Sequence, residues 1–178
     1  MKELTRYEMD GLMLDHEKAE LEYDLDATMA TLVPNPHFEI PFLGYAIDGY
    51  DAVREMYRRM ISFGSKEYNF QAYARVIAEA KNTLIREAHI SFDTPEGKRV
   101  TGLYIVVMEF DPELKKIVGE RMYADTTYAA FMKEVIGDLS NVPGISRISD
   151  GAPVIDVHDA FELAASRGVT IDNPANRL

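Results

Sequence analysis

The sequence predicts an α+β domain in which helices cover one face of a curved antiparallel sheet. Apolar residues recur at steps of three and four between residues 10 and 32, which is the pattern of a helix with one buried face. Between residues 69 and 125, four strand-length segments follow one another with only turn residues between them, which favours an antiparallel meander. Long twisted strands wrap into a cone, and the mouth of a helix-covered cone is a natural cavity for a small molecule.

The first helix is expected over Asp10–Leu32, with acidic residues largely on the faces away from its apolar stripe. Asp24-Leu25-Asp26 could interrupt this helix and restart it, with Asp24 or Asp26 as the capping residue. Val33-Pro34 ends the helix, because a proline forces the preceding residue out of the helical region. The apolar stripe comprises Leu14, Leu21, Leu25, Thr28 and Leu32.

A short strand, an apolar loop and a second helix come next. His37–Pro41 is interpreted as the strand and Phe42–Ile47 as the loop. Asp48–Asp51 opens the second helix, which runs to about Phe63 and is stopped by Gly64. We expect the inner face of this helix to carry Val53, Met56, Tyr57 and Met60.

The meander follows the second helix. Proline and glycine in Thr94-Pro95-Glu96-Gly97 occupy the positions that a tight turn favours between the second and third strands. On the second strand, Arg86 breaks a face that is otherwise apolar. The four strands are predicted over Asn69–Glu79, Thr83–Asp93, Arg99–Phe110 and Lys116–Asp125.

The character of the chain changes after residue 137. A short helix is expected over Tyr128–Ile136 and completes the cone domain, which we assign to residues 1–137. Residues 138–178 are interpreted as a C-terminal extension that packs on the core or on a partner chain. Within it, Asp138–Val154 is interpreted as a long loop and Ile155–Arg167 as a helix.

Composition excludes several classes of function. The chain of 178 residues carries a formal net charge of −11, which argues against nucleic acid and anionic lipid as partners. It has no cysteine, so disulfides, zinc–thiolate sites and cysteine nucleophiles are excluded. No signal peptide, membrane-length apolar run, phosphate loop, dinucleotide fingerprint or metal-ligand spacing is visible. We therefore expect a cytoplasmic protein that uses no metal and no cofactor.

One stretch, Lys116–Asp125, carries the main candidate site. Arg121, Tyr123 and Asp125 alternate along the expected strand, so they share one face and supply a cation, a phenol and a carboxylate. Taken alone, the pattern is typical of a solvated edge strand or an ion pair, and Asp125 could cap the following helix. In the last strand of a helix-covered cone, this face is expected to line the cavity, where burial would suit Asp125 to proton transfer.

Three histidines are further candidates. His16, His37 and His89 are each candidates for the pocket, although a histidine at any one of these positions is also typical of a purely structural residue. His89 shares a strand face with Glu87, and a carboxylate can orient an imidazole. If that face looks into the cone, His89 and Asp125 could act as base and acid. If it looks outward, Glu87 and His89 belong to a dimer interface or to solvent.

The candidate residues fall into two groups. Tyrosines suit a pocket that must be apolar and still offer hydrogen bonds, and Tyr123 has the same parity as Asp125. The candidate catalytic residues are Asp125, His89 and His37. The candidate ligand-binding residues are Arg121, Tyr123, His16, Tyr57 and Tyr104.

The order of elements resembles the nuclear transport factor 2-like superfamily, whose fold is a cone-shaped, cystatin-like α+β barrel. The resemblance covers roughly Leu12–Gly137. It rests on Phe38-Glu39-Ile40-Pro41 with Gly44, on Gly49-Tyr50-Asp51-Ala52-Val53 at the start of the second helix, and on the Lys116–Asp125 strand. The last of these looks most like the SnoaL-like polyketide cyclase branch.

The branches of this superfamily imply different chemistry. The general base of ketosteroid isomerase corresponds here to Ile40, so the resemblance does not imply that reaction. The oxyanion phenol of that enzyme corresponds to His16, which could still donate a hydrogen bond. In SnoaL-like cyclases an aspartate near the end of the last strand acts as acid or base, and Asp125 is the similar position.

We therefore expect a cofactor-independent, SnoaL-like protein that binds a hydrophobic, carbonyl-bearing small molecule. Cyclisation, isomerisation and dehydration, which would make it an isomerase or a lyase, are all open as reactions. The alternative is a non-catalytic domain for ligand binding or assembly. We also expect a homodimer, because one face of the meander is left uncovered by helices.

Overall fold

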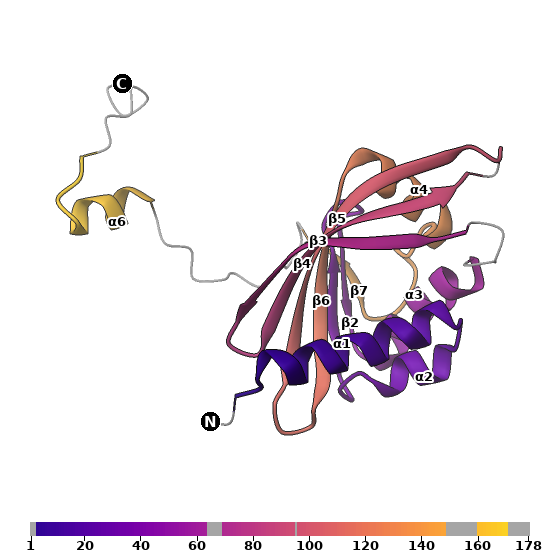
Figure 1. Ribbon diagram of the computed structural model, residues 1–178, viewed down its shortest axis with the longest axis horizontal. Coiled ribbons are helices and arrows are strands. Elements are labelled where there is room, and N and C mark those ends of the chain that lie inside the picture. Colours follow the sequence, from indigo (N-terminus) through magenta and orange to yellow (C-terminus); the bar gives the residue numbers. More distant parts are fainter. Residues whose placement is uncertain (1–2, 64–68, 95, 149–159, 171–178) are drawn as a thin grey trace.

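The computed structural model describes residues 3–63, 69–94, 96–148 and 160–170 (Figure 1). It confirms the α+β class, with helices on one side of a curved, mostly antiparallel sheet that does not close. The expected roles of Gly64 and Pro95, and the start of the helix expected over residues 155–167, lie outside the described residues.

The first helix is interrupted at its central aspartates, which confirms one of the two expected arrangements. Helix α1 spans Arg6–Leu21 and begins with a reciprocal capping box between Thr5 and Glu8. Helix α2 spans Leu25–Ala30, and the Asp24 side chain caps it by accepting a hydrogen bond from its first turn at 2.9 Å.

The residue between the two helices has an unusual backbone. Tyr23 has φ 59°, and its N–H donates to the Glu20 carbonyl at 3.0 Å while the Asp24 N–H donates to the Ala19 carbonyl at 3.0 Å. This pair of bonds is a Schellman motif, in which the left-handed position is most often glycine. A side chain at this position costs about 1 kcal/mol.

Seven strands form one sheet, in the spatial order β3-β4-β5-β6-β1-β2-β7. The four strands of the predicted meander are confirmed, and each pairs antiparallel with the next. Strand β1 joins the meander by parallel pairing with β6, where Glu39 lies beside Arg121. The strands are β1 His37–Ile40, β2 Tyr45–Asp48, β3 Gln71–Ala80, β4 Thr83–Asp93, β5 Arg99–Asp111, β6 Lys116–Ala124 and β7 Ile145–Arg147.

Strands β2 and β7 form where loops were expected. Tyr45, Ala46 and Ile47 of β2 are all buried, so the strand lacks the alternation that marks a half-exposed strand. A tight turn places β2 beside β1, with Gly44 at φ 75° and its N–H bonded to the Ile40 carbonyl. Strand β7 then pairs with the other edge of β2.

The remaining helices cover the sheet or lie apart from it. Helices α3 (Tyr50–Phe63) and α4 (Thr126–Ile136) pack on each other and close the side of the core where α1 and α2 lie. Helix α6 (Ala160–Ser166) lies away from the sheet (Figure 1). None of the described helices is both long and apolar enough to cross a membrane.

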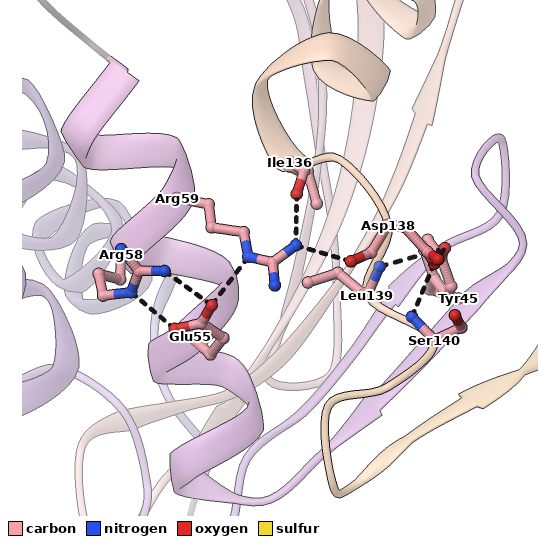
Figure 2. Close-up of polar contacts among 8 residues, drawn as sticks. All are labelled: Tyr45, Glu55, Arg58, Arg59, Ile136, Asp138, Leu139 and Ser140. Atoms are coloured by element: carbon pink, nitrogen blue, oxygen red, sulfur yellow. Dashed lines mark hydrogen bonds and ion pairs between the residues drawn. The ribbon is translucent and has the colours of Figure 1, made fainter.

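A polar network ties the end of α4 to α3 and to β2 (Figure 2). Arg59 of α3 donates from one nitrogen to the carbonyls of Ile136 and Asp138, both at 2.8 Å, and its Nε donates to Glu55 at 2.8 Å. The Tyr45 hydroxyl donates to the Asp138 carboxylate at 2.9 Å. These bonds satisfy carbonyls at the C-terminal end of α4 and so hold that helix over the sheet.

A β-bulge in β6 decides which side chains point into the cone. Ile117 pairs with Phe110 and Glu120 pairs with Met108, and all four of these side chains are buried. Because the register shifts between these two pairs, an odd-numbered residue and an even-numbered residue of β6 face the same way. Gly119 belongs to the bulge, where a Cβ atom would lie 1.6 Å from the His37 carbonyl oxygen of the neighbouring strand.

Candidate functional site

A cavity of about 420 Å³ opens between the helices and the sheet. Its walls are mostly apolar, and its polar lining residues are Glu17 and Glu20 from α1, Arg86 from β4, and the tyrosines Tyr23 and Tyr128. This size and this mixture of many apolar groups with a few polar ones are typical of sites for small molecules. The apolar lining includes Met60, Ile61, Phe70, Ile90, Phe131 and Val135.

His16 lies behind the inner wall of this cavity and is 1% exposed. Its Nδ1 is 2.7 Å from the Thr31 hydroxyl oxygen. That hydroxyl donates its own proton to the Thr28 carbonyl at 2.6 Å, so its oxygen accepts a hydrogen bond from the imidazole. Nδ1 therefore carries a hydrogen, and the imidazole gains or loses its second proton at Nε2.

Three side chains surround the Nε2 atom of His16. The Tyr57 hydroxyl lies at 2.9 Å, a carboxylate oxygen of Glu20 at 3.4 Å and a carboxylate oxygen of Glu120 at 3.8 Å. Glu20 belongs to the cavity wall, whereas Glu120 is 8% exposed and lies farther inside. The imidazole thus connects a carboxylate that a ligand can reach with one in the interior.

The surroundings of this cluster raise the pKa of both Glu120 and His16. Burial raises the pKa of Glu120 to about 7, with Glu20 and Glu17 adding to the rise and His16 opposing it. Burial lowers the pKa of His16, but the charges of Glu20, Glu120 and Glu17 outweigh it and raise that pKa overall. Glu120 is therefore suited to exchange protons near pH 7, and His16 holds its second proton more firmly than a free imidazole does.

Arg86 forms the second polar group of the cavity. One terminal nitrogen pairs with Glu17 and the other donates to the Tyr104 hydroxyl. Its Nε–H is buried and has no hydrogen-bond acceptor among the described residues. A buried donor without a partner is unfavourable, so a ligand or water oxygen that accepts from it would be stabilised there.

Two phenols pack on each other here, Tyr128 within the cavity lining and Tyr104 outside it. Tyr128 of α4 lines the cavity, and its ring packs on that of Tyr104 with centroids 5.6 Å apart. Burial raises the pKa of both hydroxyl groups, so both remain protonated near neutral pH and can act as hydrogen-bond donors.

We expected Arg121, Tyr123 and Asp125 to line the cavity, and this expectation is wrong, because none of the three is in its lining. The bulge in β6 turns Arg121 and Tyr123 to the outer face of the sheet, where Arg121 pairs with Glu109 at 2.7 Å and Tyr123 is 45% exposed. Asp125 is exposed and caps α4, accepting a hydrogen bond from the Tyr128 N–H at 2.9 Å. Its position supports the alternative interpretation as a helix cap.

His89 and His37 also lie outside the cavity. His89 is on the outer face of β4, 3.5 Å from a nitrogen of Arg75, and Glu87 on the same face pairs with Arg75 at 3.0 Å. The face that carries Glu87 and His89 therefore looks outward, which was the second of the two alternatives for these residues. His37 bridges Asp48 at 2.7 Å and Glu39 at 3.1 Å near the junction of β1 and β2.

Of the other candidates, His16 and Tyr57 contact each other behind Glu20, and Tyr104 contacts Arg86, where Glu20 and Arg86 are the residues that line the cavity. Sequence reasoning missed Glu17, Glu20 and Glu120. The signals were present in part. Glu17 and Glu20 lie next to His16 or one turn beyond it on the same helix. Arg86 is a charged residue on the otherwise apolar, buried face of β4, and Glu120 is a buried charged residue within β6.

No protein-family model matches the sequence, and no curated protein matches it either. Solved structures do match. A nuclear transport factor 2-like protein of unknown function from Burkholderia pseudomallei has a TM-score of 0.55 and 17% identity, covering 74% of this chain and 98% of that one. PrhC from Penicillium brasilianum has a TM-score of 0.56 and 15% identity, covering 74% and 89% of the two chains.

A third match is SalBIII, an epoxide hydrolase/cyclase-like enzyme with a role in pyran ring formation in the polyether salinomycin. Its TM-score is 0.54 at 17% identity, covering 67% of this chain and 92% of that one. At these identities the likeness shows the fold alone. The chain therefore has the nuclear transport factor 2-like fold that its sequence resembled, and its chemistry has to be argued from its own residues.

Proposed function

We propose that this protein binds a mostly apolar, carbonyl-bearing small molecule in the cone and moves a proton on it without a cofactor. The observation that supports this most directly is the environment of His16 Nε2. That atom is shared between Glu20, which lines the cavity, and Glu120, which is buried behind it. A relay of this kind lets a ligand exchange a proton with a group whose pKa is about 7.

The other polar groups suit a carbonyl oxygen. Arg86 and Tyr128 line a largely apolar cavity and carry two donors, the Arg86 Nε–H and the Tyr128 hydroxyl. Two donors at a carbonyl oxygen would stabilise the negative charge that develops there when a neighbouring carbon loses a proton. The apolar walls would hold the rest of the ligand and keep water from the reacting atoms.

The proposed step is proton abstraction beside the carbonyl. The C–H bond breaks as Glu20 takes the proton, and the electron pair moves onto the carbonyl oxygen to give an enolate. Return of the proton to a different carbon is an isomerisation. Attack of the enolate on an electrophile within the same molecule is a cyclisation. Loss of a neighbouring hydroxyl group, which leaves as water with the proton that Glu20 took, is a dehydration.

A carbonyl probe tests this function directly. In deuterated buffer, the protein should accelerate exchange of the methyl protons of 2-acetonaphthone, followed by NMR. Glu20→Gln and Glu120→Gln should each reduce the acceleration at least tenfold. Glu113→Gln, in the exposed β5–β6 hairpin, is the matched control and should exchange like the wild type. A wild-type protein that binds the probe but leaves exchange at the buffer rate would favour the alternative, a non-catalytic binding domain.

The proposal includes a cytoplasmic homodimer that associates through the outer face of the meander. Side chains that share this face by their strand register include several exposed apolar groups. Burial of such a face between two copies would remove this surface from water. The exposed apolar residues are Tyr73, Val76, Ile85 and Tyr123.

A further inference from the structure

Tyr23 has a backbone conformation that is usually found at glycine residues. Its φ of 59° is left-handed, and the Schellman motif around it is complete, with both hydrogen bonds at 3.0 Å. Those bonds come from backbone groups, so a glycine would make them equally well. The tyrosine side chain is therefore not required for the end of α1.

The other non-glycine residues with positive φ among the described residues are Asn69, Asn82 and Lys115. Asparagine tolerates this conformation because its short polar side chain bonds locally. Lys115 lies in the exposed β5–β6 hairpin. Tyr23 differs from all three because it carries an aromatic ring and lines the cone cavity.

The ring of Tyr23 is partly exposed at the cavity wall. Tyr23 is 38% exposed. Within the described residues its hydroxyl has no hydrogen bond and its ring makes no aromatic contact. It stands where the cavity wall formed by Glu20 and Leu21 reaches the end of α1, next to the exposed Leu21 side chain. A strained residue at such a site points to a function outside the fold.

We infer that Tyr23 is a specificity residue, whose ring packs against the apolar body of the ligand at the mouth of the cone. This inference rests on the proposed binding function of the cavity. The left-handed backbone turns the chain sharply between α1 and α2, so the ring is presented at the rim by a short, fixed connection. An aromatic ring with two torsions contributes contact area at little conformational cost.

The test compares four variants with the wild type, using the neutral apolar fluorophore N-phenyl-1-naphthylamine as the probe. Ala74→Trp defines the binding that takes place in the cone, because Ala74 lines the cavity from the exposed edge strand β3 and a large ring there would fill it. We define cavity binding as the probe binding that is seen in the wild type and is lost in Ala74→Trp, and this difference is the measured quantity. If the wild type shows no such part, the proposed function and this inference both fail.

Tyr23→Gly should raise the thermal midpoint by about 2–4 °C, because it removes the left-handed strain, and should weaken cavity binding of the probe about tenfold. Lys115→Gly relieves the same kind of strain far from the cavity and loses an exposed ion pair with Glu8, which contributes little, so it should raise the midpoint and leave binding within twofold of the wild type. Tyr23→Phe should bind like the wild type, because the ring makes the contact. Cavity binding by Tyr23→Gly equal to that of the wild type would overturn the inference while leaving the proposed function intact.

Discussion

The Nε2 atom of His16 lies 3.8 Å from a carboxylate oxygen of Glu120, and both side chains are almost completely withdrawn from solvent. The two residues come from α1 and β6, at opposite ends of the cone domain in sequence. Ordinary buried charges are paired at shorter distances and with additional hydrogen bonds. This pair therefore destabilises the fold when Glu120 is ionised, and that cost can be measured.

The free energy of unfolding should fall as pH rises through neutrality. The folded pKa of Glu120, about 7, is above its unfolded value, so the folded protein holds a proton that the unfolded chain has released. The contribution of Glu120 to stability is therefore present in full at low pH and is lost as pH rises through 7. The raised pKa of His16 acts in the same direction, because its stabilisation is present below the unfolded pKa and is lost as pH rises through the folded pKa.

Glu120→Gln should remove most of this dependence. We expect urea denaturation of the wild type to show a loss on the order of 2 kcal/mol between pH 5 and pH 8, and a much smaller loss for the variant. At pH 8 the variant should be the more stable protein. Glu113→Gln, with an exposed side chain, should retain the wild-type dependence. Equal pH slopes in all three proteins would contradict the assignment of the buried proton to Glu120.

Two glycine-to-alanine changes should have opposite signs. Gly119→Ala would place a Cβ atom 1.6 Å from the His37 carbonyl oxygen, so β1 and β6 would have to separate, at a cost of roughly 3 kcal/mol or more. Gly11→Ala is the matched control, because Gly11 is exposed within α1 with no atom near its added Cβ. It should stabilise the protein by about 0.5–1 kcal/mol. Thermal and chemical denaturation of both variants check these values, and a neutral Gly119→Ala would show that the bulge is not needed.

Arg86 and Glu17 should behave as one unit. Arg86→Met removes the cation that Glu17 and the Tyr104 hydroxyl share, and should cost about 3 kcal/mol. Glu17→Gln leaves the buried guanidinium with a weaker partner and should also destabilise. In the double variant the two losses should fall short of their sum by about 1–2 kcal/mol. Strict additivity in a double-mutant cycle would show that the pair contributes no specific energy.

The oligomeric state can be tested on the outer face of the sheet. We expect a dimer by size-exclusion chromatography with light scattering, and a monomer after Val76→Lys and Tyr123→Lys are combined, because two buried charges would oppose association. Leu114→Lys changes an equally exposed apolar residue in the β5–β6 loop and should leave the dimer intact. A monomeric wild type would refute the dimer.

Most of the fold could be predicted from sequence because its signals are local. The alternation of β4 and β5 and the prolines and glycines between elements each depend on a few neighbouring residues. Strands β2 and β7 were missed because the first three residues of one are all buried and the other is only three residues long. Strand β7 also forms by pairing with β2, far away in the sequence, and a local pattern does not contain that partner.

The site was less predictable for one physical reason. Parity along β6 assigns Arg121 and Asp125 to the same face as Ile117, which is correct only for a strand without a bulge. Gly119 was the available signal, since an isolated glycine within a strand pattern often marks a bulge or a close backbone approach. Shifting the parity at that residue would have moved the candidate carboxylate from Asp125 to Glu120.

The position of β1 in the sheet has a consequence for folding kinetics. The meander β3–β6 is built from hairpins between consecutive strands, whereas β1 pairs with β6 across roughly 80 residues of chain. Closing so long a loop is slow, so the meander should form first and β1 should dock onto it in a late step. The same late step brings α1 against β6. His16 and Glu120 therefore meet only as folding is completed, and a partly folded chain with an intact meander would have no proton relay.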